Sequence, residues 1–269
     1  MISIAAAIKS ALLTADPKAK AMATRAVARN WRLGRLAPLF DTEMPTRPGR
    51  PLTPKLVPPN QMPKRGRGQS LANRIAFIHA LTHIELNAID LALDIAGRFG
   101  ADQPRAFITD WLKVASEEAM HFALLERHLR VLGSHYGAHP AHNGLWEASE
   151  VTAHDLLARL AVVPLVLEAR GLDVSPATIA RFQGAGDTRS AAIMTRIYAD
   201  EITHVATGFR WFSALCDSPG ESPEVQWQQL VRTYFRGPLK PPFNDSARAK
   251  AGLTRNYYAS LASAVTAPQ

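Results

Sequence analysis

The sequence is poor in cysteine, in long apolar runs and in β-strand patterns, and each shortage excludes a class of protein. Its one cysteine, Cys216, cannot form an internal disulfide, so we expect a reducing, cytoplasmic setting. No apolar run reaches the roughly 18 residues that a membrane span needs, so no membrane association is expected. The apolar N-terminal stretch lacks a preceding basic region and a small-residue cleavage site, which argues against a secretory signal. The absence of acidic residues before Asp16 leaves an organelle transit peptide as an alternative.

The net charge of +8 is unevenly distributed along the chain. Residues 1–70 carry 13 Lys/Arg against 3 Asp/Glu, and residues 218–269 carry 6 against 3, whereas residues 71–217 carry 12 against 17. Basic ends on an acidic middle commonly complement it or stay solvated. An acidic partner such as RNA is the alternative interpretation.

Proline content and apolar periodicity divide the chain into four parts. Residues 1–36 predict an N-terminal helical arm, and residues 37–70 contain too many prolines for a helix or a central strand, so they predict an extended strap. Residues 218–269 predict a C-terminal helix and a wrapping tail. Residues 71–217 space their apolar side chains three and four apart, which predicts a four-helix bundle. Its helices are expected over about 71–100, 104–133, 152–171 and 187–216.

Two Glu-x-x-His pairs, Glu118/His121 and Glu201/His204, lie in the middle of long predicted helices. Residues three apart on a helix differ by about 300° around its axis, so both side chains of a pair point the same way. Each pair can therefore offer a metal ion a carboxylate oxygen and an imidazole nitrogen. One such pair is weak support for a metal site, since chance alone gives about 0.4 of them in this composition.

Two further glutamates lie at matched distances from the pairs. Glu85 precedes Glu118 by 33 residues, and Glu168 precedes Glu201 by 33. In an antiparallel hairpin, residues equidistant from the turn lie at the same height, and the two midpoints fall at turn-like residues 100–102 and 183–186. Each hairpin therefore predicts a Glu level with a Glu-x-x-His. The 47 residues from His121 to Glu168 are enough for a crossover connection between the hairpins.

Four carboxylates in one bundle core need compensation, because unpaired buried charge costs several kcal/mol per group. Two divalent cations would balance them, and mixed carboxylate and imidazole ligation suits iron or manganese. This ligand set occurs in ferritin-like di-iron and di-manganese proteins. We therefore predict two iron ions, with manganese or a mixed manganese–iron pair as alternatives. The predicted ligands are Glu85, Glu118, His121, Glu168, Glu201 and His204.

The stretches around these ligands resemble a known family. "ELNAIDLALD", "EEAMHF", "LEARGLDV", "ADEITHV" and "PPFN" are similar to the bacterial family catalogued as domain of unknown function 455, over about residues 70–253. The ligand pattern is similar to that of the ferritin-like superfamily. The resemblance implies an all-α, ferritin-like four-helix bundle with a long crossover between helix pairs and a di-metal site. It implies no substrate, since ferritin-like relatives store iron, activate O₂ or hydroxylate a tRNA base.

The preferred hypothesis is an oxidoreductase that activates O₂ or peroxide at the paired metals and oxidises a small organic substrate. Tyr198, one turn before Glu201, is expected near the site, either as a packed tyrosine or as a supporting residue with a hydrogen-bonding or redox role. A homodimer is a further expectation. The alternatives are an iron-storage or ferroxidase protein, whose shell packing the arms would obstruct, a tRNA-modifying di-iron hydroxylase that uses the basic arm, and a purely structural bundle.

Neighbours of the predicted ligands carry expectations of their own. Pro164 and Gly171 stand on either side of Glu168 and are expected to kink or break its helix. Glu117 and Asp200 directly precede ligand glutamates but point about 100° away around the helix. We expect these two acids to be solvated or to pair along their own helices.

Overall fold

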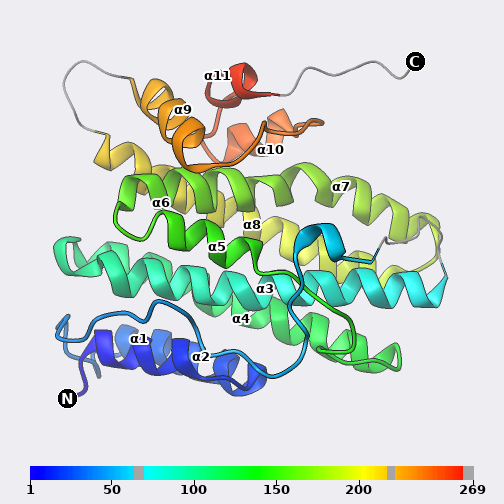
Figure 1. Cartoon of the computed structure of the whole chain (residues 1–269), viewed down its shortest axis with the longest axis horizontal. Helices are drawn as coiled ribbons and strands as arrows, with labels where there is room; N and C mark the ends of the chain where they lie inside the picture. Colours follow the sequence, from blue (N-terminus) through cyan, green and yellow to red (C-terminus); the bar gives the residue numbers. More distant parts are fainter. Residues whose placement is uncertain (64–69, 217–221, 263–269) are drawn as a thin grey trace. The chain divides into compact units, whose positions relative to one another are not determined.

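Figure 1 shows the chain as a computed structural model, in which residues 1–63, 70–216 and 222–262 are described. Regular structure in these ranges is helical, apart from the isolated β-bridges Ser3–Ala37, Leu56–Ala141 and Leu239–Ala262. The predicted all-α helical fold is confirmed. The chain forms two compact units, Met1–Glu150 and Val151–Gln269. The division into arm, strap, bundle and tail stays a prediction, and residues 64–69 of the strap and 217–221 and 263–269 of the bundle end and tail lie outside the described residues.

The first unit packs two short N-terminal helices against a long helical hairpin (Figure 1). A proline-rich extended segment joins the two parts of this unit. Its elements are α1 (Ile4–Leu13), α2 (Pro17–Arg32), η1 (Pro59–Gln61), α3 (Leu71–Phe99), η2 (Gly100–Asp102), α4 (Arg105–Val131) and α5 (Gly144–Val151), whose last residue begins the second unit.

The α3–α4 hairpin begins and turns where the sequence predicts. The hydroxyl of Ser70 caps α3 by accepting a hydrogen bond from the amide of Asn73 (3.3 Å). The 3₁₀ turn η2 ends α3, and Pro104 directly precedes α4. This turn occupies residues 100–102, so the midpoint predicted from the 33-residue spacing is confirmed for the first hairpin.

The stretch Leu71–Asp102 is long and apolar enough, by length and composition, to be tested as a membrane span. Within the described chain it is the single such candidate, and 67% of its most apolar window is buried inside the protein. Because it also carries Glu85, Asp90 and Asp94 in buried positions, α3 has the character of a core helix.

The extended segment lies along the first unit and contacts α3. Its Met44 side chain sits against Gly97 and its Phe40 ring against Gly100, where an added Cβ would approach them to 2.5 Å and 2.6 Å. The backbone carbonyl of Thr46 accepts a hydrogen bond from the indole of Trp146 in α5 (3.2 Å). Glycine near the end of α3 and at the start of η2 therefore lets the segment pack closely against the backbone.

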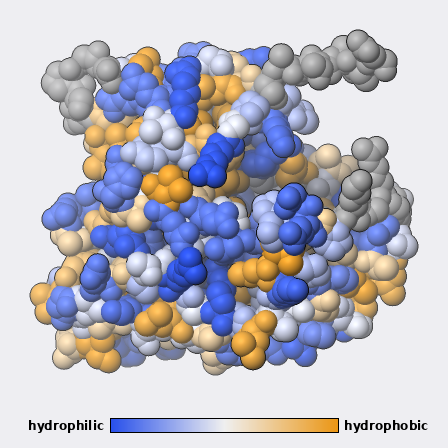
Figure 2. Space-filling view, viewed as in Figure 1, coloured by the Kyte–Doolittle hydropathy of each residue, from blue (hydrophilic) through white to orange (hydrophobic). Residues whose placement is uncertain are grey.

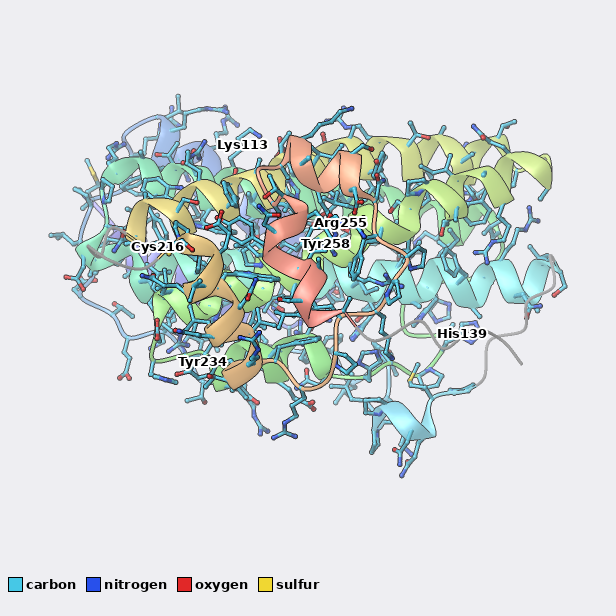
Figure 3. All side chains as sticks on the ribbon, turned by 90° about the horizontal axis from the view of Figure 1, so that it is seen from above. Lys113, His139, Cys216, Tyr234, Arg255 and Tyr258 are labelled. Atoms are coloured by element: carbon cyan, nitrogen blue, oxygen red, sulfur yellow. The ribbon has the colours of Figure 1, made fainter. Side chains whose placement is uncertain are left out.

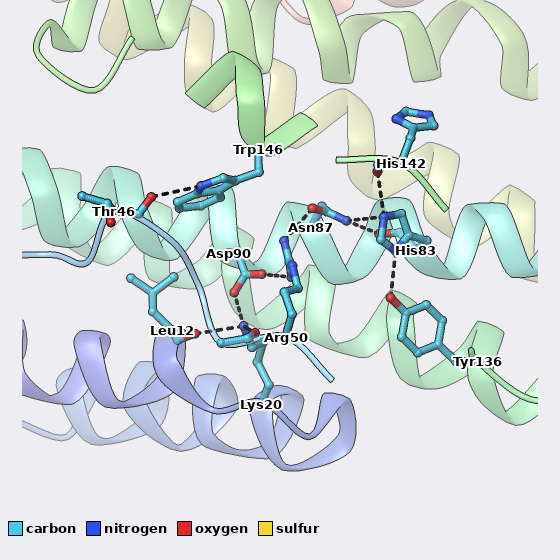
Figure 4. A network of polar contacts seen from close by, with 11 residues as sticks. Leu12, Lys20, Thr46, Arg50, His83, Asn87, Asp90, Tyr136, His142 and Trp146 are labelled. Atoms are coloured by element: carbon cyan, nitrogen blue, oxygen red, sulfur yellow. Dashed lines mark hydrogen bonds and ion pairs between the residues drawn. The ribbon is translucent and has the colours of Figure 1, made fainter. Parts of the chain in front are cut away.

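A buried ion network connects this segment and α2 to α3 (Figure 4). The Asp90 carboxylate, which is fully buried, binds the ammonium of Lys20 from α2 at 2.5 Å and the guanidinium of Arg50 from the extended segment. Arg50 also donates to the amide oxygen of Asn87 (2.6 Å). Burial lowers the pKa of Lys20, while the Asp90 charge acts in the opposite direction. The network therefore joins three segments through one carboxylate.

A histidine on α3 orders the loop after α4 in the same region (Figure 4). His83 Nε2 donates to the carbonyl of His142 (3.0 Å), which leaves Nδ1 to accept from the hydroxyl of Tyr136 (2.7 Å). Burial lowers the pKa of His83 to about 4, so the ring is neutral at physiological pH. This histidine has a structural role.

The second unit contains a second long hairpin and a tail that packs on it (Figure 1). The turn of the hairpin lies at residues 185–187, where Gly186 adopts φ +70° and Asp187 caps the next helix. The predicted midpoint at residues 183–186 overlaps this turn at residues 185 and 186, while residues 183 and 184 still belong to the helix before it. Its elements are α6 (Leu156–Val162), η3 (Val163–Glu168), α7 (Ala169–Gly184), α8 (Thr188–Leu215), α9 (Pro223–Tyr234), α10 (Asp245–Lys250), α11 (Arg255–Tyr258) and η4 (Ala259–Leu261).

The predicted end of the third helix near residue 171 is wrong. The chain stays helical through Gly171 and Pro176 to Gly184. The irregularity lies earlier, because residues Val163–Glu168 form a π-helical turn. This wider turn accommodates Pro164, which lacks the amide hydrogen that an α-helix interior requires.

The surface in Figure 2 intersperses hydrophilic with hydrophobic residues. Large exposed apolar side chains, such as Leu52, Met22 and Val131, come from separate parts of the sequence. Scattered exposed apolar residues of this kind are normal on a protein surface.

We predict that Asp90→Asn lowers the free energy of unfolding by about 3–5 kcal/mol, because it leaves the Lys20 ammonium buried without its carboxylate. Urea denaturation followed by circular dichroism measures this change. The matched control is Lys113→Ala, which removes an exposed ion pair with Glu117 and should cost at most about 0.5 kcal/mol. Equal losses in the two variants would contradict a special role for Asp90.

Candidate metal centre

In the first unit, α3 supplies Glu85 and α4 supplies Glu118 and His121 to one cluster. The three residues are 5%, 1% and 0% exposed. The three-residue spacing on α4 places Glu118 and His121 on the same side of the helix, facing α3. The matched heights of the hairpin place Glu85 opposite them. The sequence therefore predicted which three side chains of this unit meet.

The cluster is compact. His121 Nδ1 lies 3.2 Å from Glu118 Oε2 and 3.3 Å from Glu85 Oε2. The potential ligand atoms, one from each residue, all lie within 4.8 Å of one another. Two carboxylate oxygens and an imidazole nitrogen at this separation could hold a metal ion, and the donor types fit iron or manganese.

Electrostatics show the cost of burying these groups together. Burial and the neighbouring charge of Glu118 raise the pKa of Glu85 well above its usual range. Burial acts to lower the pKa of His121, but hydrogen bonds to Glu118 and Glu85 outweigh it and raise that pKa to about 11. Without a cation, the cluster therefore retains protons that carboxylates and imidazoles lose at neutral pH in water.

The second unit carries the other Glu-x-x-His pair on α8. His204 Nδ1 lies 3.6 Å from Glu201 Oε1, and the two side chains are 0% and 11% exposed. Glu168 is the last residue of the π-helical turn and is half-buried. The full set of six ligands thus remains a prediction, of which each unit carries three.

The π-helical turn at Glu168 depends on a glycine in α8. A Cβ placed on Gly208 would lie 2.4 Å from Pro164 Cβ, so only a residue without a side chain allows this approach. Gly208 follows His204 by one turn of α8. Single π-helical turns inside helices are frequent at functional sites, and this one places Glu168.

Tyr198 contacts the C-terminal tail. Its hydroxyl accepts a hydrogen bond from the side-chain amide of Asn244 (3.0 Å), and the Asn244 backbone amide donates to Asp173 (2.9 Å). Arg248 binds the same Asp173 carboxylate through two hydrogen bonds of 2.8 Å and 2.7 Å. The "PPFN" segment is therefore fastened to α7 and α8. The role of Tyr198 as a supporting residue at the metals stays a prediction.

Asp245, the first residue of α10, connects this helix to α11 within the tail. Its carboxylate accepts hydrogen bonds from Tyr258 and Arg255 (2.7 Å each), and both labelled side chains extend from α11 in Figure 3. Sequence reasoning missed Asp173 and Arg248 as the fastening pair, because their 75-residue separation carries no periodic signal. The one indication in the sequence was that Asp173 is an acidic residue within an apolar helical stretch.

The acidic neighbours of the predicted ligands pair along their own helices, as expected. Glu117 binds Lys113 at 2.9 Å, and Asp200 binds Arg196 at 2.7 Å, both four residues apart. These two acids serve as matched controls for Glu118 and Glu201.

Comparison with known proteins places the chain in a family. A family model described as "Protein of unknown function (DUF455)" matches residues 13–259. The chain belongs to the DUF455 family. It is similar to a protein of Haemophilus influenzae described only as "Uncharacterized protein", with 41% identity over 212 residues that cover 77% of this chain and 73% of that protein. No solved structure was found to match this DUF455 chain.

We predict that Gly208→Ala lowers the free energy of unfolding of this DUF455 protein by about 1–3 kcal/mol, because the added methyl group collides with Pro164. Gly171→Ala, where nothing lies within 4 Å of the added Cβ, should instead stabilise by up to about 1 kcal/mol through helix propensity. Urea denaturation of both variants measures the difference. Two changes of the same sign and size would contradict the proposed contact.

Proposed function

We propose that this DUF455 protein holds two iron ions and uses them to activate O₂ or peroxide for the oxidation of a small organic substrate. The observation that carries the proposal is the buried cluster of Glu85, Glu118 and His121. Polar groups of this kind are seldom buried together unless a cation, a proton or a full set of hydrogen bonds compensates them.

The second part of the proposal is that Glu168, Glu201 and His204 complete the same site. The support is the register of the two hairpins, since a Glu precedes a Glu-x-x-His by 33 residues in each. In the first unit the turn lies midway between them, and in the second the midpoint falls where α7 ends and the turn begins. One Glu from each of two helices and a Glu-x-x-His from each of two others is the ligand set of di-metal carboxylate bundles.

The charge balance favours two divalent cations. Four glutamates bring four negative charges to the proposed site, and two divalent ions neutralise them. The raised pKa of Glu85 is consistent with a cluster that takes up protons when no cation is bound. Binding of the metal would therefore compensate buried negative charge that the folded chain contains without it.

Iron is proposed because carboxylate and imidazole ligands suit it and because it changes oxidation state. A ferrous pair bound by these residues would supply electrons for the reduction of O₂. The chain itself contributes a fixed donor set and a dry environment. Ala115, Ala119 and Phe122, which flank the α4 ligands in sequence, are at most 1% exposed and exclude water from this stretch.

We predict about two irons per chain when the protein is purified from iron-containing medium without added metal, because the donor set should retain them. Elemental analysis by mass spectrometry measures this value. Glu118→Ala and Glu201→Ala should each lose at least one iron, whereas the neighbouring changes Glu117→Gln and Asp200→Asn should retain both. A wild-type chain without iron, even after anaerobic loading with ferrous salt, would overturn the proposal.

The same four variants test the two parts of the proposal separately. If Glu118→Ala loses metal and Glu201→Ala does not, the cluster of the first unit binds alone and the six-ligand site is wrong. If both lose metal while their controls do not, both hairpins contribute ligands.

We further predict that the di-ferrous protein reacts with O₂ within seconds, because the metals are held for that reaction. Rapid mixing with optical detection, with Glu118→Ala as the inactive control, follows the oxidation. A site that stays ferrous for many minutes in the wild type would exclude O₂ activation, leaving peroxide as the oxidant to be tested.

Size-exclusion chromatography with light scattering on the same sample distinguishes an oxidoreductase from an iron store. A monomer or dimer is expected, since a storage shell requires many copies.

A further inference from the structure

A basic groove lies in the first unit between α2 and α4, away from the metal ligands. It has a volume of about 870 Å³, and its walls carry Arg25, Arg29, Arg32, Arg35 and Lys113, against the single acid Glu117. All five basic side chains are exposed. Glu117 pairs with Lys113, so the four arginines account for the excess positive charge.

These arginines differ from several others in the described chain. Within the described residues, none of the four forms an ion pair with a carboxylate. By contrast, arginines elsewhere bind nearby acids, as shown by Arg50, Arg98, Arg130, Arg196, Arg248 and Arg255. The groove is therefore a local excess of cations that the protein does not neutralise.

Helix stability alone does not explain the arrangement. Arg29 and Arg32 lie in the last turn of α2, where the helix dipole favours basic residues. Arg25 lies earlier and is four residues from Arg29, a like-charge spacing that destabilises a helix. The packing of α2 uses a different face, including Ala21, Thr24 and Val27. The arginine face is therefore free to bind a ligand.

The geometry points to an extended polyanion. Arg25, Arg29 and Arg32 are separated by rises of about 6 and 4.5 Å along the helix, which is comparable to the spacing of successive phosphates in a nucleic-acid strand. Guanidinium groups bind phosphate oxygens through two parallel hydrogen bonds. A small-molecule site would bury most of its ligand, whereas these side chains line an open groove with their ends in solvent.

We propose that the groove binds the phosphodiester backbone of a single nucleic-acid strand. The contacts are to phosphates and not to bases, because the one aromatic residue in the groove, Trp31, is 2% exposed. Its indole is engaged with Thr109 (2.9 Å), and its ring is covered by Arg105 at 4.0 Å. Binding should therefore show little dependence on base sequence. The proposal does not rest on the metal site.

The test is fluorescence anisotropy of the full-length protein with labelled oligouridylate and oligothymidylate of about 16 nucleotides. Four phosphate contacts predict that the logarithm of the association constant falls with the logarithm of salt concentration with a slope of about −3. Arg25→Gln/Arg29→Gln/Arg32→Gln should weaken binding at least about tenfold at 50 mM salt and reduce the slope to about −1.

The matched control is Lys18→Gln/Arg127→Gln/Arg232→Gln, which removes the same charge from exposed positions outside the groove. It should bind within about twofold of the wild type. Circular dichroism and thermal melting establish that both triple variants are folded. Equal losses in the two variants would mean non-specific attraction to net charge, and would overturn the groove assignment.

Vesicles containing phosphatidylserine test a different anionic surface. Binding to both oligonucleotides that the groove variant loses supports the proposal, and so does a preference for one of the two sugars. Absence of oligonucleotide binding at low salt, or binding to vesicles alone, overturns it.

Discussion

The buried carboxylates of α3 are the constraint on which the first unit depends. Glu85, Asp90 and Asp94 lie along one helix and are each at most 5% exposed. A buried carboxylate needs a counter-charge, a proton or hydrogen bonds, and each of the three is paired with a different part of the unit. Asp90 draws α2 and the extended segment to the helix, Asp94 binds Arg98, and Glu85 meets His121 of α4. The same requirement thus orders the scaffold and brings together a cluster that could hold a metal ion.

The long-range organisation of the hairpins could be predicted because it depends on spacing. Helix length, turn position and the 33-residue register are all properties of consecutive residues, so Glu85 and Glu118 could be paired before any coordinates were known. Contacts between side chains of segments that are far apart in the sequence could not be predicted in this way. Lys20 and Asp90 are 70 residues apart, and nothing local in either segment indicates the other.

The interruption near Glu168 shows where local rules are insufficient. Pro164 correctly indicated an irregular helix, but helix-breaking propensity does not distinguish a kink, an end and a π-helical turn. Which of these forms depends on what packs against the proline. Pro176 was tolerated without an end to the helix, so tertiary packing overrides the local preference there too.

Helix α4 borders both the buried cluster and the basic groove, and it presents a different face to each. Glu118 and His121 face α3, whereas Lys113 and Glu117 line the groove against α2. Adjacent residues on a helix point about 100° apart, so a difference of one position separates a buried cluster from a solvent-exposed groove. Substitutions on one face of α4 can therefore be made without altering the residues of the other face, so the two sites can be studied separately.

Because Gly208 packs against Pro164, the residue type at each of these positions should limit the residue type at the other during evolution. A chain that acquires a larger residue at 208 has no room for the proline ring at 164. Losing that proline removes the reason for the wider helical turn and shifts the carboxylate that follows it. In related proteins, the two positions should therefore change as a pair, and retention of both should accompany retention of Glu168.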